Sequence, residues 1–432
     1  MHSSLFNRSA LFFCLVILAS NLRAQKFVTM RLDGLKEGKE LMYILHDGKS
    51  DTMAVNLFIE NAPKKYRTPK LPRFAIIGNE KKYYMGITGN VVGIGSYDFG
   101  GAVNNSANFI PSMIPIPKNP SQMRLTQFNV QQTTLAFNFV SLSSSGRVFG
   151  AYLNSNFDEN NNFNIENAYV TYGGFLVGYT ATTFSDQAAI PTTIDTQGPC
   201  GMINNTNYIV SYAHEINKHW SVGVALEVPF SDYTVNSDYE EVTSQYIPDI
   251  PLHVKYSWAA GDSWIRLAGI MRNFTYRDLI DAENRNCSGW GLNMTGSVAL
   301  GNFTAFFQGA YGKGIANYIQ DMNGLGMDLY PNNNQKGFLS LNKAWGAYGA
   351  LQYNYNPNLF STVIYSQDRV YDGGDYNIGS NYSYGQYVAA NLIWNIRSNV
   401  QVGAEYLYGR RTNINSESNH ANRINALLSF SF

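Results

Sequence analysis

The stretch NRINALLSFSF, at residues 422–432, ends the chain with side chains that alternate in character. Its apolar members share the even positions Ile424, Ala426, Leu428, Phe430 and Phe432. Its polar members fall between them, at Arg423, Asn425, Ser429 and Ser431. Because successive side chains of a β-strand point to opposite faces, this stretch is predicted to be a strand with one apolar face and one face that suits water.

The same alternation recurs upstream as far as Tyr83. After Val400, for example, Val402 and Tyr406 fall on one face, and Gln401 and Glu405 fall on the other. Each segment has the length that a tilted strand needs to cross an outer membrane. Sixteen such segments begin near Tyr83, Arg124, Arg147, Phe163, Phe175, Tyr208, Trp220, Ile250, Trp264, Trp290, Phe303, Lys343, Leu359, Tyr382, Val400 and Asn422.

The connections between these segments alternate between short and long. The short links are rich in Gly, Asn and Ser, which favour tight turns; they include residues 143–146, 173–174, 217–218, 260–262, 301–302, 356–358 and 397–399. The longest of the other links are residues 100–121, 185–206, 229–248 and 320–342. This order predicts an all-β fold, a transmembrane antiparallel β-barrel of about sixteen strands with short periplasmic turns and long external loops.

The composition agrees with a wall that separates lipid from water. Charged residues make up 14% of the chain, against about 25% in typical soluble domains, and there are 30 Tyr and 25 Phe. Past the first 24 residues, no apolar run approaches the roughly 20 residues that a membrane helix needs. The chain is therefore expected to cross a membrane with strands, over residues 83–432. Its net charge of zero gives no reason to expect a nucleic-acid partner.

The start of the chain is read as an export signal followed by an extension. Arg8 precedes an apolar stretch, and Ala24 offers a cleavage position, so residues 1–24 are predicted to be a signal peptide. Residues 25–82 hold 12 Lys and Arg against 7 Asp and Glu and lack sustained alternation. They are interpreted as a periplasmic extension with a short helix near Leu35 to His46, or as a loosely ordered basic tail.

Several stretches resemble the DcaP-like family of trimeric outer-membrane porins. They are SYDFGG (96–101), TFSDQAAIPTTIDTQGPCG (183–201), PDIPLHVKY (248–256), WIRLAGIMRNFTYRD (264–278), YGKGIANYIQD (311–321) and EYLYGRR (405–411). The resemblance implies a sixteen-stranded barrel in the outer membrane of a Gram-negative bacterium, a homotrimer, and passive uptake of small hydrophilic molecules that are often anionic. This chain departs from the family pattern at Glu166, which replaces a basic residue, and at Asn204 to Asn207, which replace an Arg-Gln pair. Both departures weaken the expected preference for anions.

Candidate pore-lining residues follow from the faces of the strands. Lys255, Arg266 and Arg272 fall opposite apolar neighbours and are expected to face the lumen; Arg124, Lys313, Arg369 and Arg411 are further basic candidates, and Glu166, Glu227 and Glu405 are acidic ones. Opposed acidic and basic walls would select solutes by charge. The alternative is that these charges pair with one another and brace the wall.

Residues 185–206 follow the fifth predicted strand, the position from which general porins fold a loop into the lumen. This link carries Asp186 and Asp195, which would then line the narrowest part of the pore. An ordinary surface loop is the alternative.

The remaining chemistry is sparse. Cys200 and Cys287 could form one disulfide, and two thiols do not make a structural zinc site, so no metal or cofactor is expected. No nucleophile motif lies near the histidines of the predicted barrel, and an enzyme is not expected. The function predicted is therefore a porin that contacts outer-membrane lipid; a closed barrel that acts as an enzyme or an adhesin is the alternative.

Overall fold

A computed structural model describes residues 27–30, 42–45, 74–77, 83–143, 147–157, 162–230, 232–376, 378–397 and 399–432. The predicted signal peptide, residues 1–24, lies outside the described residues, as does most of the predicted extension, residues 25–82. Within the described part, no helix has the length and apolar character needed to cross a membrane.

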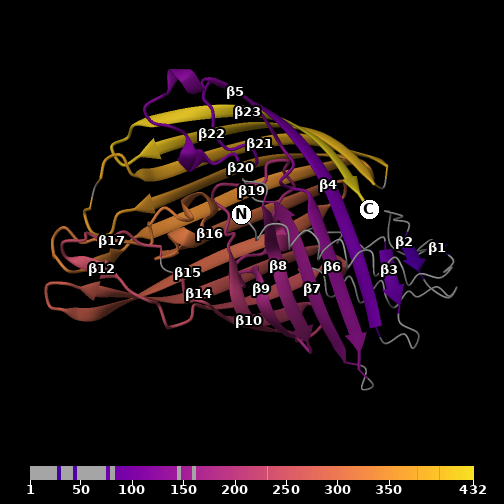
Figure 1. Cartoon of the computed structure of the whole chain (residues 1–432), viewed down its shortest axis with the longest axis horizontal. Coiled ribbons are helices and arrows are strands. Elements are labelled where there is room, and N and C mark those ends of the chain that lie inside the picture. The colour runs from indigo at the N-terminus through magenta and orange to yellow at the C-terminus, as the bar shows by residue number, and fades with distance from the viewer. Residues whose placement is uncertain are drawn as a thin grey trace, which may run out of the picture.

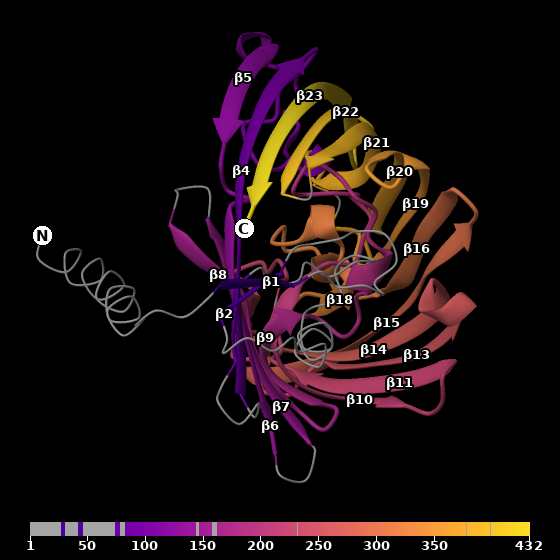
Figure 2. The ribbon, with the colours of Figure 1, turned by 90° about the vertical axis from the view of Figure 1, so that its right-hand side faces the viewer.

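Sixteen antiparallel strands form a closed barrel in the described part of the chain, and Figure 2 shows them as a ring viewed from the end that carries the short turns. Each strand pairs with the next, and the last pairs with the first through Arg423 opposite Asp98. In order they are β4 (Tyr83–Phe99), β6 (Thr134–Leu142), β7 (Val148–Phe157), β8 (Phe163–Tyr172), β9 (Phe175–Ala181), β10 (Thr206–Glu215), β11 (Trp220–Glu227), β13 (Ile250–Trp258), β14 (Ser263–Asp278), β15 (Glu283–Leu300), β16 (Phe303–Lys313), β19 (Lys343–Asn356), β20 (Leu359–Tyr371), β21 (Tyr382–Arg397), β22 (Val400–Asn413) and β23 (Ser418–Ser431).

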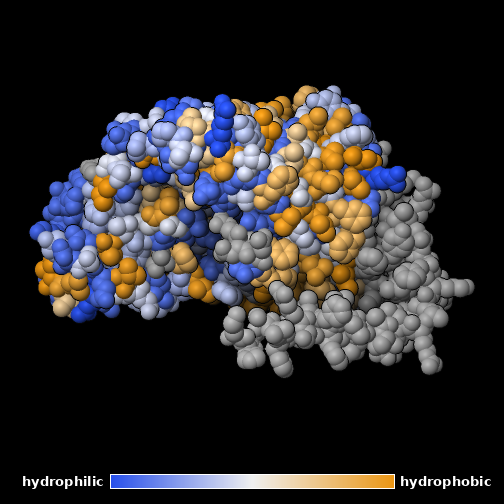
Figure 3. Space-filling model, turned by 45° about the horizontal axis from the view of Figure 1, so that its top comes forward, coloured by the Kyte–Doolittle hydropathy of each residue, from blue (hydrophilic) through white to orange (hydrophobic). Residues whose placement is uncertain are grey.

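The apolar and polar residues that alternate in the sequence lie on opposite sides of the barrel wall. In β23, the side chain of Leu428 is 60% exposed on the outside, whereas that of Arg423 is 1% exposed on the inside. Figure 3 shows apolar residues gathered over the part of the wall nearer the short turns, while the long-loop end is largely hydrophilic. Exposed apolar side chains of this density are stable only against lipid or another apolar surface, because water would oppose their exposure.

Short turns join the strands at one end of the barrel and long loops join them at the other, at the right and left of Figure 1 respectively. The β8–β9 turn consists of Gly173 and Gly174, which have φ of +57° and +91°. Such positive φ angles are costly for residues with a Cβ, which explains the glycine pair in this two-residue turn.

The loops carry the smaller elements. These are the short strands β5 (Arg124–Asn129), β12 (Glu240–Val242), β17 (Leu329–Pro331) and β18 (Leu339–Leu341), and the 3₁₀ helices η1 (Pro111–Met113), η2 (Pro120–Gln122), η3 (Gln187–Ala189), η4 (Ala259–Gly261), η5 (Ala316–Tyr318) and η6 (Gln320–Met322).

The second predicted strand proves to be two strands. β5 pairs with the far end of β4, and β6 pairs with its near end, Tyr83 to Asn90. Between them the chain turns at Val130 to Thr133, where Thr133 Oγ1 accepts a hydrogen bond from the Val92 amide at 3.1 Å. The prediction of one extended strand beginning at Arg124 is therefore wrong. β5 and β6 pair with different parts of the long strand β4, and the barrel strand begins at Thr134.

The described part of the N-terminal extension is also β-structure. β1 (Phe27–Met30) pairs antiparallel with β2 (Met42–Leu45), β2 pairs parallel with β3 (Phe74–Ile77), and β3 pairs with the first residues of β4. The short helix predicted near Leu35 to His46 is therefore wrong at Met42–Leu45, where the backbone pairs with β1. Residues 35–41 and His46 lie outside the described residues.

The inside of the barrel is filled in part by its own loops. Leu407 and Tyr387 point inward from β22 and β21 and pack with Phe109, Ile114 and Met202 from two loops. A second apolar cluster includes Phe184, Ile270, Ile315 and Tyr318. The inner face is therefore not uniformly polar, because loops that enter the barrel supply apolar partners for inward side chains.

Candidate functional site in the barrel lumen

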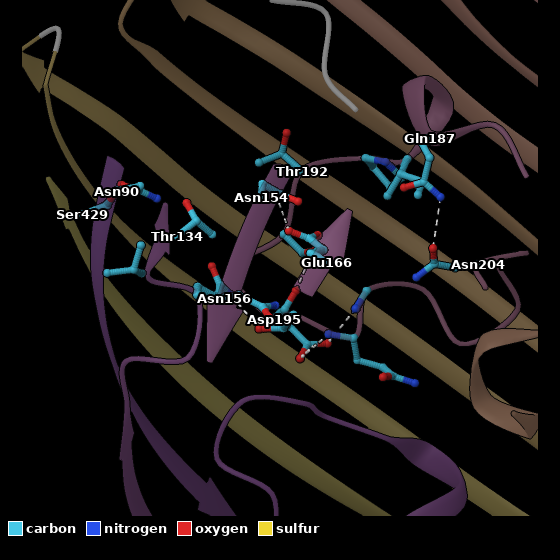
Figure 4. Close-up of a pocket in the computed structure, with 18 of the residues that line it drawn as sticks. Asn90, Thr134, Asn154, Asn156, Glu166, Gln187, Thr192, Asp195, Asn204 and Ser429 are labelled. Atoms are coloured by element: carbon cyan, nitrogen blue, oxygen red, sulfur yellow. Dashed lines mark hydrogen bonds between the residues drawn. The ribbon is translucent and has the colours of Figure 1, made fainter. Parts of the chain in front are cut away.

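A cavity of about 560 Å³ lies inside the barrel, and we call it the lumen cavity. On one side it is bounded by β4, β6, β7 and β8, and on the other by the link between β9 and β10, residues 182–205, which we call the lumen loop. Figure 4 shows Asn90 and Thr134 on the wall, with Gln187, Thr192 and Asp195 on the lumen loop. Side chains from β16 and from β19 to β23, with Gln132 of the turn between β5 and β6, complete its lining.

More than half of the lining residues carry uncharged polar side chains. Eleven of its residues are Asn or Gln, and most of the others are Thr, Ser or small apolar residues. Its charged members are Glu166 and Asp195, and no Lys or Arg is among the described residues that line it. The lumen cavity thus offers hydrogen-bond donors and acceptors with a negative bias.

A chain of hydrogen bonds holds the wall side of the lumen cavity. Asn154 Nδ2 donates to Glu166 Oε2 at 2.8 Å, and Asn167 Nδ2 donates to Asn154 Oδ1 at 3.0 Å. Thr180 Oγ1 then donates to Asn167 Oδ1 at 2.5 Å. Glu166 and Asn167 both reach the cavity although they are adjacent, because the β7–β8 register shifts between Asn154 and Ser155. Such a bulge redirects a side chain that regular alternation would send outward.

The lumen loop is fixed to the opposite wall by Glu405 of β22. Its carboxylate accepts hydrogen bonds from the backbone amides of Ile194 at 2.9 Å and Asp195 at 2.7 Å. Asn391 Nδ2 of β21 donates to the carbonyl of Thr192 at 2.8 Å. These contacts hold the loop across the lumen rather than at the rim.

Asp195 continues this attachment at its own side chain. Its carboxylate accepts from the amide of Phe109 at 2.8 Å and from Tyr387 Oη at 3.0 Å. Burial, together with repulsion from the nearby Glu405, raises the pKa of Asp195 to about 7. Asp195 therefore joins a second loop to the lumen loop.

The other end of the lumen loop is attached to β14 and β15. Asp186 Oδ2 accepts from Trp264 Nε1 at 2.9 Å and from Thr295 Oγ1 at 2.8 Å. The guanidinium of Arg266 donates to the carbonyls of Thr183 and Phe184. The guanidinium of Arg266 is thus bonded to the lumen loop, and its side chain is buried.

Arg272 is at the centre of a second buried network. Its guanidinium bonds to Asp249 at 3.0 Å and to Asp328 at 2.7 Å, and it also donates to the carbonyls of Gly314 and Phe230. Each of its three nitrogen atoms therefore donates to a loop atom. Tyr318 Oη extends the network from Asp249, at 2.9 Å, toward Glu227. The network joins two loops, residues 228–249 and 314–342, to the wall, and it does not line the lumen cavity.

Comparison with known proteins identifies the family of this barrel. The sequence profile described as DcaP outer membrane protein matches residues 75–432. The chain belongs to the DcaP outer membrane protein family. It is therefore a protein of the Gram-negative outer membrane. No curated protein matches the chain.

Solved structures support the same fold. The outer membrane channel DcaP of Acinetobacter baumannii superimposes with a TM-score of 0.71 at 20% identity, over 82% of this chain and 99% of that one. OmpF of Salmonella typhi, solved with daunomycin, gives 0.52 at 11% identity over 82% and 99%, and OprB of Pseudomonas putida gives 0.50 at 10% identity over 82% and 95%. At these identities the likeness shows the fold alone.

In this DcaP-family chain, the predicted pore residues separate into three groups, with Lys255 apart from them. Glu166 and Asp195 line the lumen cavity. The inward residues that instead attach loops to the wall are Asp186, Glu227, Arg266, Arg272, Glu405 and Arg411. Lys255 is half-buried, and its ammonium lies 4.2 Å from the centre of the Trp264 ring.

The third group was assigned to the wrong face. Arg124 lies opposite Phe99, on the outer face of the β4–β5 pair. Lys313 is paired with the exposed Trp290, and Arg369 lies on the same face of β20 as the exposed Val363 and Tyr365. These three bases point outward because each shares the parity of the apolar outer residues in its strand.

An important pair was not predicted. Arg423 of β23 bonds to Asp98 of β4 at 2.5 Å and 2.9 Å, and both side chains are buried at the seam between the first and last strands. Arg423 Nη2 also donates to the carbonyl of Val103 at 2.9 Å. Alternation placed Arg423 on the inner face, but its partner depends on how the barrel closes.

The candidate disulfide between Cys200 and Cys287 is not formed. Cys200 is a free buried thiol beside Ser366 Oγ, and Cys287 is a free, partly buried thiol beside the carbonyl of Leu339. The two cysteines lie in different apolar clusters, which keeps them from pairing. In the described part of the chain, no group of three or more His, Cys, Asp or Glu residues is placed to hold a metal ion.

Proposed function

We propose that the protein is a porin, a passive water-filled channel for small hydrophilic solutes across the outer membrane. The observation that carries this proposal is the lumen cavity, a polar space inside a closed barrel of the DcaP family. A closed β-barrel satisfies all of its backbone hydrogen bonds in lipid and leaves its interior available for water.

The position of the lumen loop supports this function. Because the loop lies across the lumen and is held by Glu405, Asp186 and Arg266, it narrows the interior of the barrel beside the lumen cavity. A fixed constriction suits a channel that selects solutes by size and polarity.

We also propose that the protein forms a homotrimer. The family resemblance implies this assembly, and the outer face of β4, β5 and β23 carries exposed apolar side chains, with Phe128 81% exposed. Such a face could meet either lipid or a neighbouring barrel. Chemical crosslinking of the detergent-purified protein should give a trimer band, and a crosslinked product no larger than the monomer would contradict this assembly.

The channel proposal is tested by single-channel recording of the purified protein in a planar lipid bilayer. Stepwise increases in KCl current are expected, in groups of three if the trimer inserts as a unit. Protein that is folded by circular dichroism and inserts into lipid, yet gives no steps, would contradict the channel and favour a closed barrel.

A further inference from the structure

We propose that the lumen cavity selects neutral, polyhydroxylated solutes of the size of a single pyranose sugar and disfavours anions. This inference rests on the proposed channel function and names the class of solute that the channel takes. It follows from three properties of the lining: its charge, its hydrogen-bonding groups and its aromatic carbon surface.

The first step concerns charge. An anion crossing the lumen would need basic groups to replace its hydration. The inward guanidinium groups of Arg266, Arg272 and Arg423 are buried and directed at loop carbonyls or carboxylates, and none of them lines the lumen cavity. The cavity instead presents the carboxyl group of Glu166, whereas that of Asp195 is bonded to Phe109 and Tyr387. An anion therefore meets the acidic side chain of Glu166 there and no base in the described lining.

The second step concerns hydrogen bonds. A side-chain amide carries both a donor and an acceptor, which suits a hydroxyl group that also does both. Several lining amides are held by one end only. Asn90 Oδ1 accepts from Ser429 Oγ at 2.7 Å, and Asn204 Oδ1 accepts from Gln187 Nε2 at 3.0 Å. Within the described residues, their Nδ2 groups have no protein partner and are available to a solute.

Other lining amides are held by their nitrogen atoms and leave their oxygen atoms available as acceptors. Gln401 Nε2 donates to Asn395 Oδ1 at 2.8 Å, and Gln132 Nε2 donates to Ile194 O and Thr196 Oγ1, each at 2.7 Å. Both amide oxygens remain without a partner in the described part of the chain. The lining thus holds these four amides in place and leaves two donors and two acceptors available, an arrangement that costs little entropy when a polyol enters.

The third step concerns the remaining surface. Tyr152, Phe306 and Phe360 contribute aromatic carbon to the lining. Tyr152 is held by stacking on Tyr169, with ring centroids 5.4 Å apart. The C–H faces of a pyranose ring are apolar and pack on such surfaces, whereas the hydroxyl groups at the ring edge meet the amides. At about 560 Å³, the cavity also falls in the range of small-molecule sites.

The test is a swelling assay with proteoliposomes that contain the whole mature protein. The probes are glucose, glucosamine and glucuronate, three pyranoses of similar size that carry no charge, a positive charge and a negative charge. The entry rate of glucuronate should be lower than that of glucose by a factor of roughly three or more, whereas glucosamine should enter at least as fast as glucose. Equal rates for all three, or a faster rate for glucuronate, would overturn the inference.

A variant tests whether the lumen cavity is responsible. Thr134→Arg places a base in the lining, and Gln335→Arg adds the same charge on an exposed external loop. T134R should raise the glucuronate rate toward that of glucose, and Q335R should leave the ratio unchanged. If T134R does not fold, N156R on β7 serves the same purpose. A base in the cavity that leaves the ratio unchanged would overturn the assignment.

The two proposals fail differently. A protein that conducts KCl in a bilayer and admits all three pyranoses equally remains a channel and lacks the proposed selectivity. A folded protein that gives neither current nor swelling contradicts the channel function itself, and the inference with it.

Discussion

The backbone amide of Asp195 donates to Oε1 of Glu405 over 2.7 Å, although 210 residues separate the two in sequence. The same carboxylate accepts from the amide of Ile194 at 2.9 Å. One inward acid of β22 therefore holds the middle of the lumen loop against the far wall. The width of the channel depends on this attachment, because the loop bounds one side of the lumen cavity.

Glu405→Gln is expected to loosen the lumen loop. Glutamine keeps one acceptor oxygen for two backbone amides and removes the charge, and a hydrogen bond to a charged group contributes about 1.5–3 kcal/mol. The single-channel current of E405Q should show more frequent transitions between conductance levels than that of the wild type. Glu417→Gln, on an exposed loop, is the matched control and should leave the current trace unchanged. A quiet E405Q channel would show that the loop is held by other contacts.

Arg272→Met is expected to destabilise the folded protein strongly. It leaves the carboxylates of Asp249 and Asp328 buried without their cation, and breaking a buried ion pair in this way costs about 3–5 kcal/mol. Urea unfolding in detergent should show this loss of free energy. Arg277→Met changes a partly exposed arginine of the same strand, whose guanidinium bonds only to Asn284 among the described residues. Its effect should be much smaller, and equal losses in the two variants would contradict the network assigned to Arg272.

The contact between two external loops should depend on pH through Asp232. Its carboxylate accepts from the amides of Gly326 at 2.9 Å and Gly324 at 3.1 Å. Burial and repulsion from Asp328 raise its pKa to about 6, above the usual value of 3.8. Between these two pKa values, the carboxyl group of Asp232 therefore keeps its proton in the folded loops, whereas in the unfolded chain it has lost that proton. Their stability is greatest below about pH 4 and falls as pH rises toward 6.

Thermal unfolding of Asp232→Asn measures this effect. The midpoint of the wild type, relative to that of D232N, should rise as pH is lowered from 7 to 4.5. Asp238→Asn, an exposed change on the same loop, should show no such trend. A wild-type advantage that instead grows with pH would mean that Asp232 is stabilised as a carboxylate.

With the predicted signal peptide, residues 1–24, removed, the two remaining cysteines should behave as free thiols. Burial raises the pKa of the Cys200 thiol, which lowers the amount of the reactive thiolate. In the Cys287→Ser variant, Cys200 of the folded protein should react slowly with a neutral disulfide reagent. After unfolding, the same thiol should react fast. Unfolded wild-type protein should titrate two thiols without a reductant. Fewer than two would indicate the disulfide that the structure lacks.

Much of the wall could be predicted from alternation. The predicted starts at Phe163, Phe175, Trp220 and Ile250 coincide with those of β8, β9, β11 and β13. The pattern is informative because lipid and water impose opposite requirements on successive side chains. It was less reliable at β5 and β6, where Val130 to Thr133 break the strand without a strong turn signal.

The site was harder to predict, because parity gives the direction of a side chain and not its partner. Arg266 and Arg272 do point inward, yet their charges are used by loop atoms that are remote in sequence. Closure of the barrel sets the Arg423–Asp98 pair, which local pattern does not reveal. For Lys313, the parity of Tyr311 and Phe303 in the same strand was a usable signal that it faces outward.

The central claim is that the basic side chains inside the barrel are bonded to loop atoms, and that the lining of the lumen cavity is polar with a negative bias. The reversal potential of single channels under a tenfold KCl gradient tests this claim. The potential should have the sign of a cation-preferring channel, and Glu166→Gln should move it toward zero. A potential with the sign of chloride preference would show that basic groups line the permeation path, and would contradict this account.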